Sequence, residues 1–466
     1  MDFLTVGLRR LSLMVLSLAL AGWPLFSQSF YGSIVGTVSD TSGASIANAE
    51  VTLLNSGTNE RRSAQTDSGG NYQFVNLVPG RYQVEVVQSG FKRLTRRDIL
   101  VEVQSTVRID AALQVGEMGQ VVEVKAESPM LQTETSSLGH VVQSRAVQQM
   151  PLNGRNVLNL VALAPGVIPN GQSMGNPTMT SNSAWGNYQI GGGIANQSAA
   201  LLDGAPLNTG YNNAVQLVPT QDAIQEFRVQ TNSVTAEFGR FGGGVVNLTS
   251  KSGTNDLHGS AYEFLRNRVL NSNTFFNNRS AVARPAFTQN QFGASAGGPV
   301  IRDKTFFFGS YEGFRLRQGN SVLRTVPSLD LREGNFANWR GANGNVIPIY
   351  DPLTTCGTNG NGACGNGQTV LRQQFPGNII PPSRIDPVAK SLRSIWALPN
   401  LPGQALTNIN NFARNSSGGG SSDQINVRVD QNLSNRQRLF GRYTRWTNFQ
   451  LPNDVFLTTS VRLEVQ

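Results

Sequence analysis

Residues 150–253 restrict the fold of this chain more than any other stretch, because they combine helical spacing with closely spaced strand and turn segments. Apolar residues recur at helical spacing from Val157 to Ala164 and stop before Pro165, which predicts one short amphipathic helix. Segments dense in Gly, Asn, Thr and Ser follow, at residues 200–206, 219–229 and 236–253. We expect short strands and tight turns there, and therefore a compact domain of mixed helix and strand.

The order of these segments resembles the plug domain of TonB-dependent outer-membrane receptors, most closely the Oar-like branch. The resemblance implies a plug over residues 130–254 that fills the lumen of a transmembrane β-barrel. A polar lumen wall favours compact backbone and many hydrogen-bonding side chains over a large apolar core. The abundance of Gly and Asn in this stretch fits that requirement.

The resemblance assigns six residues to the plug scaffold: Asn153, Gly154, Arg155, Asp203, Gly204 and Arg240. Asp203 and Gly204 follow an apolar strand and predict a tight turn, so we expect a structural role and not a ligand contact. Arg155 and Arg240 are candidates for charge-assisted bonds to acidic residues of the barrel wall, and solvated surface arginines are the alternative. Ligand contacts are expected from the outward plug loops at residues 170–187 and 208–213, but no ligand can be named from them.

Residues 29–115 show strand segments at short, regular spacing with turn residues between them, which predicts a small antiparallel β-sandwich. The segments at residues 36–40 and 66–72 resemble the carboxypeptidase regulatory-like domain, also described as carbohydrate-binding-like. That domain is not catalytic, and metal ligands are missing from these segments. Asp67 opens a tight turn, which is a commoner role for such a residue than binding calcium.

A short apolar segment, Val121, Val122, Glu123 and Val124, lies between the sandwich and the plug within residues 116–129. It predicts an unpaired strand on a tether, able to add to the sheet edge of a partner. The segment resembles the TonB box, which implies a TonB-type energy-coupling protein as partner. The alternative is that it forms the last strand of the sandwich.

Residues 1–28 predict a secretory signal peptide, because Arg9 and Arg10 precede an apolar run that is too short to span a bilayer. Export favours oxidation of Cys356 and Cys364, the two cysteines of the chain. We expect them to close a small disulfide loop outside the membrane, and two free thiols are the alternative.

The formal net charge is +9, although charged residues make up only 14% of the chain. The basic residues are scattered singly and lack a recognition motif, so we expect no nucleic-acid partner. Contacts with anionic lipopolysaccharide of the outer membrane, or with the barrel lumen, fit that scatter better.

From residue 255 onwards the sequence has the character of β-hairpins. Residues 257–265, 291–300, 305–317 and 438–446 predict strands, and residues 424–430 show the clearest alternation of apolar and polar side chains. Residues 321–422 are expected to contain external loops, with a disordered linker as the alternative. A barrel of about 22 strands needs about 220 residues at about 10 per crossing, more than residues 255–466 supply. We therefore expect either the N-terminal part of a longer receptor or a truncated gene, and a smaller assembly is the alternative.

Enzymatic chemistry is not favoured by the sequence. Residues 171–175 match the Gly-x-Ser-x-Gly pattern, but the buried strand and the helix that this pattern requires do not flank it. Clustered His and Cys ligands for zinc are also lacking, and we expect no cofactor and no metal.

The predicted fold is mainly β: a β-sandwich, an α+β plug and the first strands of an antiparallel transmembrane β-barrel. The implied function is TonB-coupled import of a nutrient across the outer membrane of a Gram-negative-type bacterium, with carbohydrate or peptide as candidate ligands. The alternative is a cell-surface carbohydrate-binding or adhesion protein without active transport. Dependence on the proton gradient distinguishes the two.

Overall fold

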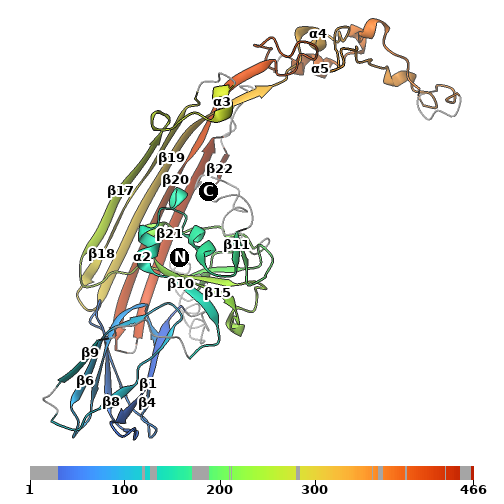
Figure 1. Ribbon diagram of the computed structural model, residues 1–466. Coiled ribbons are helices and arrows are strands. Elements are labelled where there is room, and N and C mark those ends of the chain that lie inside the picture. Colours follow the sequence, from blue (N-terminus) through green and yellow to red (C-terminus); the bar gives the residue numbers. More distant parts are fainter. Residues whose placement is uncertain are drawn as a thin grey trace, which may run out of the picture. The chain divides into compact units, whose positions relative to one another are not determined.

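The computed structural model describes residues 30–117, 121–125, 134–169, 188–208, 210, 213–279, 284–358, 360–365, 371–393, 396–435, 437–451 and 463–465. The expected signal peptide lies outside these residues. The chain divides into two compact units (Figure 1). The first comprises Met1–Glu263, Phe292–Gly313 and Asp423–Thr447, and the second comprises Phe264–Gln291, Phe314–Ser422 and Asn448–Gln466.

The N-terminal part of the first unit is a β-sandwich of two sheets. In one sheet β1 (Gly32–Asp40) lies between β4 (Asn71–Leu77) and β7 (Thr106–Arg108), and β8 (Ala111–Leu113) also pairs with β1. The other sheet has the order β3 (Arg61–Gln65), β2 (Glu50–Asn55), β5 (Gly80–Val87), β6 (Arg93–Val101) and β9 (Val121–Lys125). Alternate residues of β1 and β5, such as Ile34 and Val84, are fully buried between the sheets. The period-two apolar pattern therefore builds the sandwich core.

The prediction of an unpaired strand at residues 121–124 is wrong. β9 pairs in parallel with β6, with Leu94 opposite Val122. The physical reason is that β6 would otherwise leave a row of backbone donors and acceptors open, and an apolar strand that follows closely in the chain satisfies them. Among the described strands β9 is nevertheless the last of its sheet and is paired along one edge.

The plug part of the first unit has a five-stranded sheet with the order β10 (Leu138–Val142), β15 (Ile224–Asn232), β16 (Val245–Ser250), β13 (Ala199–Leu202) and β14 (Ala205–Pro206). A separate pair joins β11 (Val167–Pro169) to β12 (Tyr188–Ile190). Short helical segments complete the plug: α2 (Ser144–Gln149), η1 (Asn153–Arg155), η2 (Val157–Leu163), η4 (Gln221–Ala223) and η5 (Ala236–Phe238). Apolar side chains of η2 and of one face of β15 and β16 form the plug core.

The predicted helix at residues 157–164 is present as the 3-10 helix η2. The side chain of Asn156 begins it by accepting a hydrogen bond of 2.9 Å from the backbone N–H of Leu158. Over so few residues, apolar spacing cannot separate a 3-10 helix from an α-helix, because both place residues three apart on one face.

The barrel strands form one sheet in chain order: β17 (His258–Asn267), β18 (Phe287–Ile301), β19 (Thr305–Arg324), β20 (Phe412–Ser434), β21 (Gln437–Leu451) and β22 (Leu463–Val465) (Figure 1). These strands include every barrel segment predicted from the sequence. β18 and β19 meet at a tight turn, residues 302–304.

Within the first unit β20 exposes its apolar side chains and buries its charged ones, the opposite of a strand in a water-soluble protein. Ile425, Val427 and Val429 are 43%, 43% and 44% exposed, whereas Arg428 and Asp430 are 2% and 0% exposed. An apolar outer face with a charged inner face is the arrangement of a strand that has lipid on one side and a filled lumen on the other. None of the described helices is long and apolar enough to cross a membrane.

The second unit holds the connection between β19 and β20, which is built from short helices and turns. The helices of this connection are α4 (Leu329–Arg332), η7 (Pro352–Thr354), η8 (Pro376–Asn378), η9 (Pro382–Arg384) and α5 (Pro387–Leu392). The same unit contains η6 (Arg268–Leu270) and α3 (Phe275–Arg279), which lie between β17 and β18. The buried side chain of Asn378 donates to the carbonyl oxygens of Phe336 and Ile347 and accepts from the N–H of Ile349. Cys356 and Cys364 form a disulfide. Much of this connection is therefore ordered loop and not a disordered linker.

Candidate functional site

A group of buried charges joins the plug to the barrel strands of the first unit. We call it the charge cluster: Glu60 of the sandwich, Asp203 of the plug, and Arg428, Asp430, Arg438 and Arg442 of β20 and β21. Three guanidinium groups thus face three carboxylates. The side chains of Asp203, Arg428 and Asp430 are at most 2% exposed, so none of these charges has water as a substitute partner.

Arg428 is the centre of the charge cluster. Its Nε and Nη2 donate to the two oxygens of Asp430 at 2.9 and 3.0 Å, and its Nη1 lies 3.3 Å from Oδ1 of Asp203. Nη1 also donates to the carbonyl oxygen and to Oγ of Ser250 at 3.0 and 2.8 Å. A buried ion pair stabilises a protein only when such additional hydrogen bonds offset the desolvation of the charges. Arg428 meets that condition and ties β20 to the plug.

Asp203 owes its position to a two-residue turn between β13 and β14. Asp203 and Gly204 both have positive φ, 50° and 81°, as the turn of a tight hairpin requires. The turn directs the carboxylate at the end of β16, where Ser250 donates to it from its backbone N–H at 2.9 Å and from Oγ at 2.6 Å. Nε of Arg442 lies 3.0 Å from the second oxygen. Asp203 is therefore both a turn residue and the plug's carboxylate in the charge cluster.

A second group of charges surrounds Arg155 of η1. Its Nη2 lies 2.5 Å from Oδ2 of Asp222 in the plug, and its Nε lies 3.1 Å from Oε2 of Glu312 on β19. Tyr262 of β17 donates to the same oxygen of Glu312, and its ring lies 4.0 Å below the Arg155 guanidinium. Gly154, with φ of 70°, supplies the left-handed backbone that precedes Arg155. Arg155 therefore joins the plug to two barrel strands.

The structure does not bring Arg240 to any described acidic residue of the wall. Arg240 is exposed, lies over the ring of Phe241 and forms no ion pair with any described residue. Among the described residues Arg240 fits the alternative of a solvated arginine, and its bond to an acidic wall residue stays a prediction. The side chain of Asn153 and most of the two predicted ligand loops lie outside the described residues.

A third contact joins the sandwich to the plug. The turn after β6, residues 102–105, packs on the polar face of β15. Oε1 of Glu226 accepts from the N–H of Val103 at 2.5 Å, and Nη1 of Arg228 donates to the carbonyl oxygen of Gln104 at 2.7 Å. Glu226 and Arg228 are 5% and 1% exposed. Burial raises the pKa of Glu226 to about 8, against the effect of the hydrogen bond from Val103, and the nearby Glu102 adds to the rise.

The contact between sandwich and plug is expected to weaken as pH rises. Between the ordinary pKa of 4.5 and about 8, the unfolded chain has lost the Glu226 proton while the folded chain keeps it, so stability falls across that interval. Thermal unfolding of the full chain at a series of pH values measures the slope. Glu226→Gln should remove most of it, whereas Glu50→Gln, at an exposed sandwich carboxyl, should leave it unchanged. Equal slopes in all three proteins would contradict the assignment.

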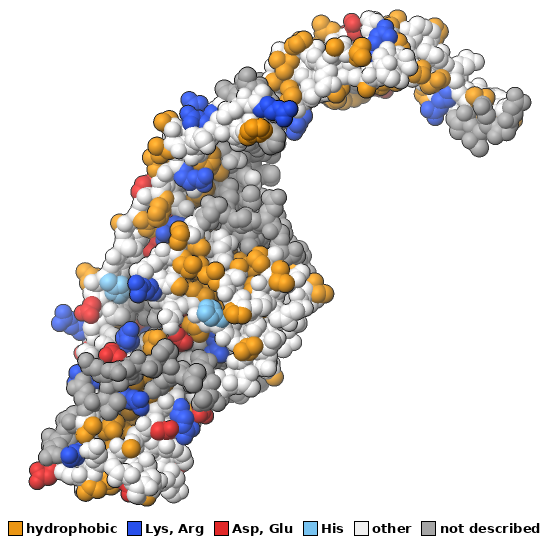
Figure 2. Space-filling view, viewed as in Figure 1, with side chains coloured by type: hydrophobic (Ala, Val, Ile, Leu, Met, Phe, Trp, Pro, Cys, Tyr) orange, Lys and Arg blue, Asp and Glu red, His pale blue; other side chains and the backbone are white. Residues whose placement is uncertain are grey.

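Sequence reasoning missed Glu60, Glu226, Arg228, Glu312, Arg428, Asp430, Arg438 and Arg442. A usable signal was present for two of them, because Arg428 and Asp430 are the polar positions of the alternating segment 424–430. Groups of three or more metal-binding side chains do not occur among the described residues. Lys and Arg side chains on the visible face are dispersed and do not form one continuous patch (Figure 2).

Two protein families match parts of this chain. A carboxypeptidase regulatory-like domain matches residues 33–114, and an outer membrane beta barrel domain matches residues 249–463. The sandwich corresponds to the first match. The second match begins at the end of β16 and covers β17 to β21 together with the ordered loops.

The chain is 26% identical over 346 residues to the TonB-dependent transporter Oar of Myxococcus xanthus. The match covers 70% of this chain and 30% of the transporter, so the chain spans about a third of that relative's length. Among solved structures, a ferric enterobactin receptor of Pseudomonas aeruginosa is 13% identical over 68% of this chain and 34% of the receptor, with a TM-score of 0.34. A 3-chlorocatechol 1,2-dioxygenase of Rhodococcus opacus is 11% identical over 20% of this chain and 62% of the enzyme, with a TM-score of 0.17.

Proposed function

We propose that this chain, which belongs to the TonB-dependent outer-membrane receptors of the Oar-like branch, binds a nutrient outside the cell and imports it when a TonB-type protein displaces its plug. The residues 121–124 are the segment that the energy-coupling protein engages. The apolar face of β20, with Ile425 and Val427, contacts outer-membrane lipid. No covalent chemistry is part of this function.

The observation that carries the proposal is a continuous series of contacts from β9 to the plug. β9 pairs with β6, and β6 leads directly into the turn at residues 102–105. That turn is bonded to Glu226 and Arg228 of β15, the strand next to the centre of the plug sheet. A force applied to β9 would reach the plug through backbone hydrogen bonds and through the buried side chains of Glu226 and Arg228.

The position of β9 also suits an exchange of partners. It is five residues long, and only one of its edges is paired among the described strands. A partner strand could add to its free edge, or could pull it away from β6 at the cost of a few backbone hydrogen bonds. Both routes use the backbone, so the exact side chains of the segment matter less than its extended conformation.

Cross-linking tests whether this segment meets the energy-coupling protein. A single cysteine at position 122, Val122→Cys, is expected to cross-link to the TonB-type protein in intact cells, because Cys356 and Cys364 are paired and leave no competing thiol. Mass spectrometry identifies the product. Ser68→Cys, in an exposed sandwich turn, is the matched control and should give no product. Failure at position 122 together with uptake that ignores an uncoupler would favour the adhesion alternative.

A further inference from the structure

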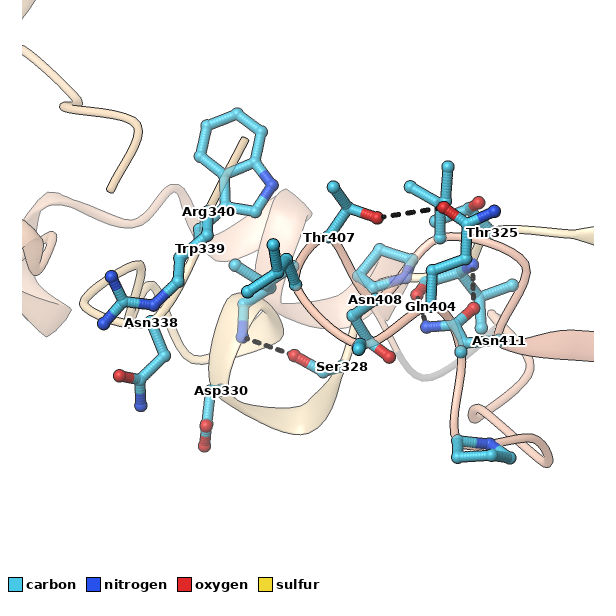
Figure 3. A pocket seen from close by; sticks show the side chains of 18 of the residues that line it. Thr325, Ser328, Asp330, Asn338, Trp339, Arg340, Gln404, Thr407, Asn408 and Asn411 are labelled. Atoms are coloured by element: carbon cyan, nitrogen blue, oxygen red, sulfur yellow. Dashed lines mark hydrogen bonds between the residues drawn. The ribbon is translucent and has the colours of Figure 1, made fainter. Parts of the chain in front are cut away.

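The connection between β19 and β20 forms an open pocket of about 800 Å³ in the second unit (Figure 3). Its wall comes from two stretches of this connection, residues 325–340 and 402–411, with Trp396 added from a third. In the close view Trp339 and Arg340 lie on one side, and Gln404, Thr407 and Asn408 lie on the other. The volume is in the range of pockets that bind small organic ligands.

Hydrogen bonds to backbone fix the base of the pocket. The fully buried side chain of Asn411 accepts from the N–H of Val326 and donates to its carbonyl oxygen, both at 2.8 Å. Oγ1 of Thr325 accepts from the N–H of Asn410 at 3.0 Å. The end of β19 and the start of β20 are thereby held together, so the two stretches of the wall keep a defined separation.

A second set of bonds holds the aromatic wall. Arg332 of α4 donates from Nη1 to the carbonyl oxygens of Arg393 and Trp396 at 3.1 and 2.8 Å, and from Nη2 to the carbonyl oxygen of Ala397. The backbone of Trp396 is fixed in this way, yet the residue is 57% exposed. A large exposed indole on a fixed backbone offers a flat apolar surface that costs a ligand little ordering entropy.

The polar wall has donors and acceptors that the protein does not use. Among the described residues, the Asp330 carboxylate and the side-chain amides of Asn338 and Asn408 make no hydrogen bond. Asn408 lies in a turn closed by bonds of 2.8 and 2.9 Å between the backbones of residues 404, 408 and 409, and its φ is 54°. Primary amides offer both donors and acceptors to a ligand.

The charges of the pocket cancel. Asp330 and Arg340 are its one acid and its one base, and the remaining polar side chains are amides and hydroxyls. A strongly anionic or cationic ligand would therefore gain little binding free energy from this pocket, despite the net charge of +9 on the whole chain. Flat apolar surfaces combined with neutral donors and acceptors suit a neutral molecule that has apolar C–H faces and many hydroxyl groups. A peptide would bind better to an open strand edge, with which its backbone can form hydrogen bonds.

We propose that this pocket binds a neutral oligosaccharide, which stacks on Trp396 and Trp339 and bonds Asp330, Asn338 and Asn408 through its hydroxyl groups. The proposal rests on the proposed function only for what happens to the saccharide after it has bound. In that function, the pocket is the place where a transported saccharide is first held. Binding itself does not depend on a TonB-type protein. The two proposals can therefore fail separately.

The test is titration of the purified full chain, in detergent, with defined probes. Tryptophan fluorescence and calorimetry measure the binding of each probe. The probes are three neutral oligosaccharides (maltoheptaose, cellohexaose and xylohexaose), a uronic-acid hexamer and a neutral decapeptide. We expect at least one neutral oligosaccharide to bind, and the uronic-acid hexamer and the peptide to bind at least tenfold more weakly. A preference for the peptide or for the acidic sugar, or no binding of any neutral probe, overturns the proposal.

Variants locate the binding. Trp396→Ala should weaken saccharide binding at least tenfold and Trp396→Phe should restore part of it, because a flat ring is retained. Tyr350→Ala removes an exposed ring of the same connection outside the pocket and should change nothing. Saccharide binding that is equal in wild type and Trp396→Ala overturns the proposal. Binding without uncoupler-sensitive uptake would contradict the transport function and leave this pocket assigned.

Discussion

Asp203→Ala is expected to destabilise the first unit by about 3–5 kcal/mol, because breaking a buried ion pair leaves the remaining charge without compensation. Arg428 and Arg442 would both lose their plug carboxylate. Ser250 would lose the acceptor for its backbone N–H and for its hydroxyl. The measurements are the thermal unfolding temperature in detergent and the rate at which a protease cleaves the plug.

Two further variants make this result specific. Asp98→Ala breaks an ion pair with Arg81 in which both side chains are more than 60% exposed, and such pairs contribute at most about 1 kcal/mol. Combining Asp203→Ala with Arg428→Met should destabilise less than the sum of the single changes, because the uncompensated charge is removed. Equal effects of Asp98→Ala and Asp203→Ala would show that the charge cluster does not hold the plug.

Val122→Pro is expected to abolish energised uptake while folding and ligand binding remain intact. Proline removes a backbone N–H and fixes φ, so it prevents a short strand from forming a full ladder with any partner. Val122 is only partly buried, so the sandwich core loses no fully buried side chain in this variant. Uptake of a labelled oligosaccharide that the wild-type protein binds is followed with and without an uncoupler.

The sandwich itself supplies a matched control for this variant. Ser63→Pro places the same substitution in β3, the strand at the opposite edge of the same sheet, where Ser63 pairs with Thr52. It should lower the unfolding temperature as much as Val122→Pro does and leave uptake unchanged. If both variants, or neither of them, lose uptake, then residues 121–124 are not the energy-coupling segment.

The sequence was sufficient for the features that depend on local patterns. The alternation at residues 424–430 predicted a strand with two unlike faces, and the pair Asp203 and Gly204 predicted the tight turn that the structure contains. Both depend on the side-chain period of a strand and on the φ values that Asp and Gly tolerate. Neither requires knowledge of distant residues.

Partners that are distant in the chain could not be predicted in this way. Asp203 and Arg428 are separated by 225 positions, and Arg155 and Glu312 by 157. Nothing in the neighbourhood of Arg155 distinguishes it from Arg240, yet one is held by two carboxylates and the other is exposed. The difference arises from where the folded backbone places each guanidinium relative to the wall.

The pairing of β9 was mispredicted for a related reason. An apolar run of a few residues satisfies the pattern of a free strand and that of a sheet edge equally well. Whether it pairs depends on the open edge of β6, which exists only after the sandwich has formed. For residues 321–422, abundant Pro, Gly and Asn indicated loops but could not reveal that Arg332, Asn378 and Asn411 hold them in place.

The burial of the charge cluster also determines how the plug responds to salt. Dissolved ions screen exposed charges over about 8 Å at physiological ionic strength, but they cannot enter the space between Arg428, Asp430 and Asp203. Changes in the ionic composition of the surroundings therefore leave these bonds nearly as strong as before, while pairs such as Arg81 and Asp98 weaken. A change of salt concentration alone should therefore not loosen the contact of Asp203 in the plug with β20 and β21.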